Sequence, residues 1–300
     1  MKIKILLNPY SNRWNAKARW PEAEAALKAA GVDFDLSVSE RADQLVDLAA
    51  DAVKQGFTTI VAAGGDGTIG EVVNGMIRDW DGESKIPAML GILPLGSAND
   101  FVFGLGLPSD LKEAVKVIAS GKTRPVDLGK CNERFFINNS GLCLEPYVTT
   151  KHERIHWIKG IARYLVAAVW AIMDKPEWNG QLKWDNGEFK GPLSLVSIGN
   201  GRRTGGFFMT PHADPFDGKL TLAFGYRATR LGLFDALPRA FKEGEGSYLE
   251  LDGMRELHFK RLTVHLDKPS PAHTDGELFD TWLADLEYKI FPGAIQVLCN

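Results

Sequence analysis

The sequence predicts an α/β fold in its first part and a β-rich sandwich in its second part. The 300 residues suffice for two domains of ordinary size. Up to residue 127 short β-branched runs alternate with longer helical patterns, which is typical of a Rossmann-like, mostly parallel sheet. After that point strand-like runs dominate. We therefore expect an α/β nucleotide-binding domain over residues 1–127 and a β-sandwich domain over 128–300, whose last strand can pack back on the first domain.

The expected elements of the first domain follow one another in strict alternation. Helical patterns are followed closely by Gly31, Gly56 and Gly121, and glycine readily takes the left-handed conformation that ends a helix. Strand patterns cover residues 2–7, 33–39, 58–65 and 89–96, and helical patterns cover residues 21–31, 42–56, 68–77 and 111–121.

The second domain shows helical patterns only near residues 160–174 and 231–242. The remaining apolar runs are short and bounded by turn residues, as expected of antiparallel strands. These runs cover residues 134–141, 181–185, 193–200, 220–226, 262–267, 287–291 and 294–298.

Composition excludes several classes of protein. The net charge of −3 and the pI near 6.1 argue against a nucleic-acid partner, because nonspecific binding of nucleic acid needs a basic face. Cys131, Cys143 and Cys299 fit neither a disulfide framework nor a metal-ligand spacing, so a reducing cytoplasm is expected.

No transmembrane segment is expected. The apolar run Ile3–Leu7 is too short for the core of a signal peptide. The longest apolar segment, Ile161–Met173, is interrupted by Arg163 and is shorter than the roughly 20 residues that span a bilayer.

The stretch "TTIVAAGGDGTIGEVVNGM" (Thr58–Met76) combines a buried strand, a glycine-rich turn and a helix. Glycine lets backbone N–H groups approach an anion, and the start of a helix carries partial positive charge, so the turn favours phosphate. Asp66 within it would repel a bare phosphate by about 4 kcal/mol at 4 Å and an effective dielectric near 20. A divalent cation between the two groups reverses the sign, which predicts Mg²⁺ beside a nucleoside triphosphate.

Two other interpretations of this turn stay open. Gly65, Gly67 and Gly70 formally match the dinucleotide fingerprint of an oxidoreductase, although the turn follows the third strand pattern and contains Asp66. The turn can also be a tight strand-to-helix connection with an exposed aspartate.

The combination of motifs resembles the catalytic domain of diacylglycerol kinases and their bacterial lipid-kinase relatives, a superfamily shared with sphingosine and ceramide kinases. The resemblance starts from "GGDGTIGEVVNGM" and "LPLGSANDF" (Leu93–Phe101), in this order and spacing. It extends to "NPYSNR" near the start, to Gly199–Leu222 and to "TDGE" (Thr274–Glu277). The family fold implies an active site in the cleft between the two domains.

The resemblance also implies a set of nucleotide-binding residues. Arg13 supplies positive charge to a phosphate or is a solvated loop residue. From the residues alone, Ser97 follows a strand-like run and should face the same crevice as the first turn. The implied ATP site comprises Asn8, Pro9, Tyr10, Ser11, Asn12, Arg13, Ser39, Gly64, Gly65, Asp66, Gly67, Thr68, Glu71 and Ser97.

Asp275 and Glu277 are the predicted catalytic residues. One residue separates them, so extended backbone would point both carboxylates to one face. Phosphorylation of an alcohol needs a group that accepts the hydroxyl proton. Asp275 is expected to do this, and Glu277 either shares that role or holds Mg²⁺. The competing interpretation is a surface turn, because Asp-Gly is a common hairpin dipeptide.

A metal site is implied by "ADPFDGKL", in which Asp217 matches the aspartate that binds a structural Mg²⁺ in relatives. Asp214 and Lys219 would offer only carbonyl oxygens. Acidic residues corresponding to Asp66, Asp100 and Asp127 would link this metal to the nucleotide loop, although capping or turn roles are alternatives for Asp100 and Asp127. A cluster of carboxylates repels itself without a cation.

The basic segment Lys151–Leu165 surrounds Trp157 and Ile158. It either packs into the core of the second domain or rests on an anionic lipid surface.

The chain departs from the family pattern at a few positions. Ala98 stands where glycine is common, Asn12 where glycine is usual, and Val102 and Phe103 follow Phe101 where relatives place an arginine. The missing arginine leaves room for an altered grip on ATP or an altered substrate.

The function expected from the sequence is an ATP- and Mg²⁺-dependent kinase that phosphorylates a hydroxyl of a diacylglycerol-like lipid. It would act in the cytoplasm, peripheral to the inner face of the membrane, and a homodimer is left open. The alternatives are a kinase of NAD or another soluble alcohol, and a noncatalytic regulator that binds nucleotide or lipid.

Overall fold

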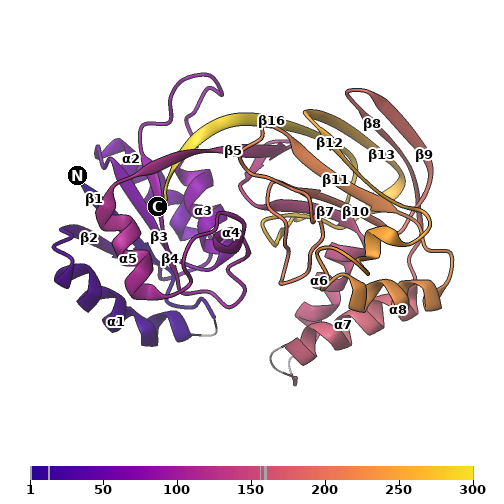
Figure 1. Cartoon of the computed structure of the whole chain (residues 1–300), viewed down its shortest axis with the longest axis horizontal. Coiled ribbons are helices and arrows are strands. Elements are labelled where there is room, and N and C mark those ends of the chain that lie inside the picture. The colour runs from indigo at the N-terminus through magenta and orange to yellow at the C-terminus, as the bar shows by residue number, and fades with distance from the viewer. Residues whose placement is uncertain (1, 13, 156, 159–160, 300) are drawn as a thin grey trace.

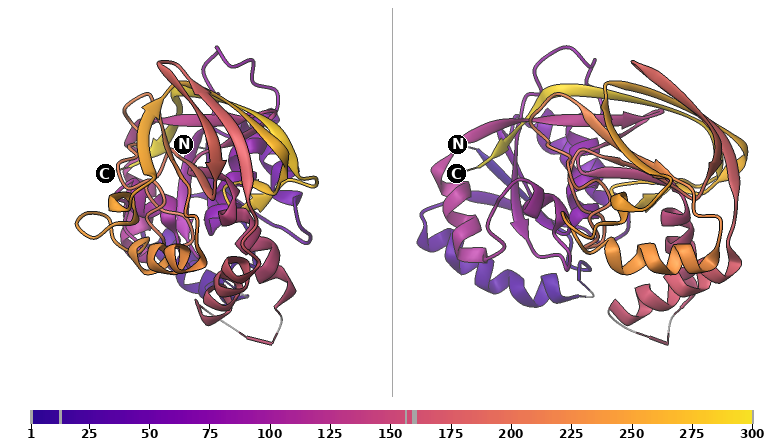
Figure 2. Two further views of the ribbon diagram at one scale, coloured as in Figure 1. Left: turned by 90° about the vertical axis from the view of Figure 1, so that its right-hand side faces the viewer. Right: turned by 45° about the vertical axis from the view of Figure 1, so that its right-hand side comes forward.

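The computed structural model describes residues 2–12, 14–155, 157–158 and 161–299 of the chain. It forms two lobes side by side, and both ends of the chain lie in the first lobe (Figures 1 and 2). A long strand, β16 (Leu283–Leu298), runs from the second lobe into the first.

The first lobe is built on a parallel sheet with the strand order β2-β1-β3-β4. Its β3 is buried along its whole length, which explains the uninterrupted apolar run of the sequence. The strands are β1 (Ile3–Leu7), β2 (Phe34–Val38), β3 (Thr59–Gly64) and β4 (Met89–Pro94).

Helices cover both faces of this sheet. The helices α1 (Asn15–Ala29) and α5 (Leu111–Ser120) share one apolar core with β1. On the other face, α2 (Gln44–Lys54) and α3 (Asp66–Met76) share a second core with β3 and β4. A short helix, α4 (Asp100–Gly104), follows β4.

The ends of α5 show how local sequence sets the bounds of a helix. The side chain of Asp110 accepts hydrogen bonds from the backbone N–H groups of Lys112 and Glu113, and Gly121 ends the helix with a φ of 65°. These are the side-chain cap and the left-handed glycine that helix termini favour.

The second lobe is a sandwich of two sheets packed through one apolar core. Phe224, Leu262 and Tyr288 are among the large side chains in this core. One layer is antiparallel and contains β12 (Met254–Phe259), β11 (Leu220–Gly225), β10 (Leu195–Gly199), β7 (Asn139–Cys143), β14 (Ala272–Thr274) and β15 (Glu277–Leu278). The other contains β16, β13 (Arg261–Ser270), β8 (Trp178–Trp184) and β9 (Gly187–Leu193). In this layer β5 (Thr123–Cys131) pairs with β16, and β6 (Arg134–Phe136) pairs with β5.

The two strands expected at residues 287–291 and 294–298 form the single strand β16. Its register against β5 shifts between Phe291 and Ile295, because Pro292 has no N–H to donate and Gly293 has a φ of 58°. Beyond the shift, Val297 pairs in parallel with Leu90 of β4. One sheet therefore continues from lobe to lobe, and β5 crosses the expected boundary at residue 127.

Helices α6 (Leu144–Arg154), α7 (Ile161–Asp174) and α8 (Arg230–Arg239) and the 3-10 turn η1 (Tyr248–Glu250) lie on one side of the sandwich (Figure 1). The sequence predicted α7 and α8 but missed α6. Within the described residues, no helix is long and apolar enough to cross a membrane. The architecture confirms the predicted fold class of an α/β domain followed by a β-sandwich.

Candidate active site

The predicted nucleotide-binding residues follow the parallel strands of the first lobe. Asn8–Asn12 follow β1, Ser39 follows β2, Gly65 and Asp66 follow β3, and Ser97 lies beyond β4. The carboxyl ends of parallel strands meet at one edge of the sheet, which is where ligands bind in open α/β folds. The structure therefore brings these loops together, whereas Arg13 lies outside the described residues.

Thr68 ties the first loop to the start of α3. Its hydroxyl oxygen accepts a hydrogen bond of 3.1 Å from Nδ2 of the Asn8 side chain and lies 3.1 Å from the hydroxyl oxygen of Ser11. The side-chain oxygen of Asn8 accepts in turn from the N–H of Tyr10. These bonds fix the loop over the helix terminus, where backbone N–H groups favour an anion.

The two glycine turns pack directly on each other. The N–H groups of Leu95 and Gly96 both donate to the carbonyl of Gly64 over 2.9 Å. A Cβ at Gly96 would lie 2.4 Å from the Cα of Gly65, closer than atoms tolerate. The second turn thus needs glycine so that its backbone can lie against the predicted phosphate-binding turn.

Asp275 lies in a hairpin turn, not in the predicted extended backbone. Asp275 and Gly276 have φ values of 49° and 86°, and Thr274 pairs with Glu277 across the turn. That conformation matches the Asp-Gly hairpin turn, so the assumption of an extended segment was wrong. Asp275 is nevertheless buried, with only 6% of the residue exposed, whereas Gly276 and Glu277 are exposed.

The carboxylate of Asp275 is held by three backbone donors. The N–H groups of Ile137, Asn138 and Asn139 each donate to it over 2.9 Å. Burial raises the pKa of Asp275 to about 6, the three N–H groups act to lower it, and the charge of Asp66 raises it. The carboxylate is therefore fixed in place and largely ionised at neutral pH.

The Asp275 turn lies against the first turn of α3. A Cβ at Gly70 would lie 3.2 Å from Oδ2 of Asp275, and one at Gly67 would lie 3.0 Å from Oε1 of Glu277. The structure thus places the two predicted catalytic carboxylates beside the predicted phosphate-binding turn. Glu71 of α3 belongs to the same group of acidic residues. Burial raises its pKa to about 7, and the charge of Glu277 contributes to this shift.

Asp66 and Asp100 connect the turn to neighbouring segments. Asp66 accepts a hydrogen bond from the N–H of Phe101 at the start of α4. Asp100 accepts from the N–H of Gly206 and lies 3.2 Å from the guanidinium of Arg203. Burial and the charge of Asp66 raise the pKa of Asp100 to about 6, despite these favourable partners.

The predicted metal ligands do not converge on one point. Asp127 accepts backbone N–H groups from Gly218 and Gly293. Asp214 and Asp217 accept from the N–H groups two residues further on, those of Phe216 and Lys219. Among the residues that the structure describes, no group of three or more His, Cys, Asp or Glu side chains is arranged to hold a metal. The structural cation at Asp217 stays a prediction.

Arg203 and Glu145 belong to this region but were not singled out from the sequence. Arg203 comes from "GNGRRTGG" in the second lobe, and its guanidinium lies over the ring of Phe103, 4.5 Å from the centroid. A positive charge therefore lies beside α4, where the expected arginine after Phe101 is missing. Glu145, buried at the start of α6, had no signal in the sequence beyond its place after an apolar run.

The basic segment 151–165 is divided between the core and the surface. Lys151 is buried and paired with Asp174, and Ile155 packs in a small core with α7. Trp157 is 79% exposed. Lys159 lies outside the described residues.

Comparison with known proteins identifies the family of both parts of the chain. The family profile of the diacylglycerol kinase catalytic domain matches residues 2–131, and the YegS C-terminal NAD kinase beta sandwich-like domain matches residues 141–299. A crystal structure of a diacylglycerol kinase from Bacillus anthracis superposes with a TM-score of 0.74 at 20% identity, covering 100% of this chain and 97% of the other.

Two relatives are similar in sequence. A diacylglycerol kinase of Staphylococcus haemolyticus is 34% identical over 221 residues, which cover 73% of this chain and 66% of that protein. A Chromohalobacter salexigens protein named "Probable lipid kinase YegS-like" is 34% identical over 280 residues, covering 91% of this chain and 86% of the relative.

The fold and these matches define a phosphotransferase whose acceptor is an alcohol group. Within that class, the chain belongs to the family of diacylglycerol kinases and related bacterial lipid kinases.

Proposed function

We propose that this protein is an ATP- and Mg²⁺-dependent kinase that phosphorylates a hydroxyl group of a diacylglycerol-like lipid at the cytoplasmic face of the membrane. The observation that carries the proposal is the contact between the Asp275 turn and α3. It puts a fixed carboxylate from the second lobe beside a phosphate-binding turn of the first lobe, at the distances given above.

The triphosphate would lie on the N-terminus of α3, where Gly65, Gly67 and Thr68 present backbone N–H groups. The acidic residues Asp66, Glu71, Asp275 and Glu277 lie in this region. Burial first, and the charges of neighbouring carboxylates second, raise the pKa values of Glu71 and Asp275. Carboxylate oxygens are ligands that Mg²⁺ prefers, and Mg²⁺ that arrives with a nucleotide takes other ligands from the phosphates and from water, so one or two carboxylates suffice to hold this cation. Asp66 and Glu277 would hold it, and it would neutralise charge on the phosphates.

Asp275 would accept the proton of the lipid hydroxyl. A general base works best when its pKa lies just below the working pH, and the value of about 6 meets that condition. The three backbone N–H groups hold the carboxylate in one orientation. The same bonds favour the ionised form, which is the form that accepts a proton.

An apolar cavity in the second lobe supports a lipid acceptor. It has a volume of about 110 Å³ and lies between the sandwich and the helices α6, α7 and α8. Tyr164, Ala168 and Ile172 of α7 line it, and Phe207 and Met254 are also among the lining residues. The apolar side chains of this lining suit the acyl chain of a lipid, whose burial is favourable by the hydrophobic effect.

The outer face of α7 supports contact with a membrane surface. Val166, Val169, Trp170 and Met173 are 37%, 43%, 41% and 53% exposed. Their spacing of three and four residues forms one apolar stripe. The inner face of the same helix lines the cavity, so α7 would separate the bilayer from the lipid-binding space.

The direct test incubates the purified protein with labelled ATP and Mg²⁺ and offers diacylglycerol, monoacylglycerol, phosphatidylglycerol, sphingosine and NAD separately. We expect label on a lipid and loss of transfer when EDTA removes the cation. Label on NAD alone would contradict a lipid substrate. ATP binding without transfer to any acceptor would favour the noncatalytic regulator.

A further inference from the structure

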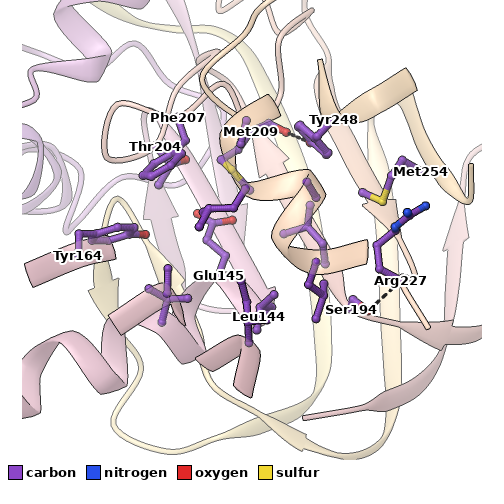
Figure 3. Close-up of a pocket in the computed structure, with 18 residues that line it drawn as sticks. Leu144, Glu145, Tyr164, Ser194, Thr204, Phe207, Met209, Arg227, Tyr248 and Met254 are labelled. Atoms are coloured by element: carbon purple, nitrogen blue, oxygen red, sulfur yellow. Dashed lines mark hydrogen bonds between the residues drawn. The ribbon is translucent and has the colours of Figure 1, made fainter. Parts of the chain in front are cut away.

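Glu145 places an acidic group in the apolar cavity. It lies in the first turn of α6 and lines the cavity, although only 7% of the residue is exposed. Figure 3 shows its carboxylate between the side chains of Tyr164 and Met209. A buried charge is costly unless it is hydrogen-bonded, so its partners decide what it does.

One oxygen of Glu145 is bonded to His273. Nε2 of His273 lies 3.0 Å from Oε1 of Glu145, and the N–H of Gly276 donates to Nδ1 of His273 over 3.3 Å. A ring nitrogen that accepts carries no proton, so this geometry fits Nε2 as the nitrogen that donates to Glu145. His273 therefore satisfies one oxygen of Glu145.

The other oxygen is left without a donor. Among the residues that the structure describes, Oε2 of Glu145 has no hydrogen-bond partner, and the same holds for the hydroxyl of Thr204, which also lines the cavity. A Cβ at Gly141 would lie 2.7 Å from Oε2 of Glu145, so the carboxylate fills the space beside this glycine. An acceptor that is buried and unpaired in this way is suited to a donor on a ligand.

Glu145 is linked to the Asp275 turn through its bonded partner His273. His273, its partner, stands two residues before Asp275, and Gly276 of the same turn donates to that histidine. Thr204 follows Arg203, whose guanidinium pairs with Asp100. The charges of Glu145 and Asp100 both act to raise the pKa of Tyr164, after the larger effect of burial.

We propose that Oε2 of Glu145 binds a second hydrogen-bond donor on the lipid head, a hydroxyl or an ammonium group close to the hydroxyl that is phosphorylated. The preferred substrates are then lipids with such a donor, namely monoacylglycerols or long-chain amino alcohols. Diacylglycerol presents only ester oxygens at that place, and these would face the carboxylate as a second acceptor. This inference rests on the proposed lipid-kinase function and names its substrate class.

A purely structural role for Glu145 predicts different kinetics. If Glu145 only positions His273 and the Asp275 turn, its substitution lowers turnover equally for every lipid. If it binds the head group, substitution changes the ratio of kcat/KM between lipids with and without the donor. The ratio therefore separates the two roles.

The experiment measures kcat/KM with monoacylglycerol, a long-chain amino alcohol and diacylglycerol of matched chain length. It compares the native protein with Glu145→Gln, Glu145→Leu and the control Asp285→Asn, which alters an exposed carboxylate–histidine pair. We expect the native protein and the control to prefer a donor-bearing lipid over diacylglycerol by roughly tenfold or more. Glu145→Leu should bring the ratio close to one.

Glu145→Gln separates the two donors, because its amide oxygen still accepts from a hydroxyl but no longer attracts an ammonium ion. If the native protein prefers the amino alcohol and Glu145→Gln loses that preference, the ligand is an ammonium group. If the native protein prefers monoacylglycerol and Glu145→Gln keeps that preference, the ligand is a hydroxyl group. Equal use of diacylglycerol by the native protein would overturn the inference while leaving the lipid kinase intact. No transfer to any lipid would overturn the proposed function and this inference with it.

Discussion

Single residues determine the chemistry of this site. For Asp275, the turn was predictable from the sequence, but the partners of the carboxylate were not. The dipeptide Asp275-Gly276 was expected either in extended backbone or in a hairpin turn, and the hairpin is what forms. The neighbours of the carboxylate were not predictable, because Ile137, Asn138 and Asn139 are more than 130 residues away in the chain.

The roles of Glu145 and Arg203 were not predictable from the sequence. Glu145 and Arg203 look like ordinary charged residues at the ends of apolar or glycine-rich runs. Their importance comes from burial and from partners in other segments, His273 and Asp100. Local patterns report periodicity and turns, whereas the pairing of distant side chains depends on the completed fold.

Glu71 provides a prediction about stability at the residue scale. Burial and the charges of Glu277 and Asp43 raise its pKa from 4.5 to about 7. A raised carboxyl pKa contributes stability below pH 4.5 that is lost as the pH rises through 7. Glu71→Gln should therefore raise Tm by about 2–4 °C at pH 8 and less at pH 5.

Thermal unfolding followed by circular dichroism at both pH values measures this effect. Glu133→Gln serves as the control, because the side chain of Glu133 is 97% exposed. An equal change of Tm at pH 5 and pH 8 would show that the ionisation of Glu71 is not the cause.

At the scale of secondary structure, strongly periodic and buried elements were predictable. The parallel strands and the helices α7 and α8 lie where their patterns indicated. Helix α6 was missed, because its sequence contains Pro146 and the β-branched run Val148–Thr150, which are poor helix formers. Pro146 is tolerated in the first turn, and packing against α7 supplies the remaining stability.

The exposed stripe of α7 predicts membrane binding at this scale. The double variant Val169→Asn and Met173→Gln removes two exposed apolar side chains from the stripe. Lost burial in the bilayer should weaken binding to lipid vesicles roughly tenfold. Co-sedimentation with vesicles of phosphatidylglycerol and phosphatidylcholine measures the change.

Leu36→Gln is the matched control for that measurement. Leu36 is 39% exposed on β2, which lies in the other lobe, far from α7 (Figure 1). We expect the control to bind vesicles like the native protein. Unchanged binding of the α7 variant would exclude the stripe as the membrane contact.

At the scale of the whole molecule, the site exists because one sheet joins the two lobes. The strand β16 pairs with β13 in the sandwich and with β4 in the first lobe, so the lobes are held in a fixed relation. Further contacts pass through α4. Asp66 accepts a hydrogen bond from the N–H of Phe101 in α4, and Asp100 of the same helix accepts one from the N–H of Gly206 in the second lobe. The sequence predicted two domains and a cleft by resemblance, and it expected the last strand to pack on the first domain, as β16 does. The register that aligns the two lobes depends on pairings between distant segments.

The central claim is that Asp275, brought from the second lobe to the N-terminus of α3, accepts the proton of the substrate hydroxyl. The most direct measurement is turnover against pH for the native protein and Asp275→Asn, with ATP binding measured separately. We expect native turnover to fall about tenfold per pH unit below pH 6, and Asp275→Asn to lose roughly 100-fold or more while ATP binding is kept. Full turnover by Asp275→Asn would contradict the account.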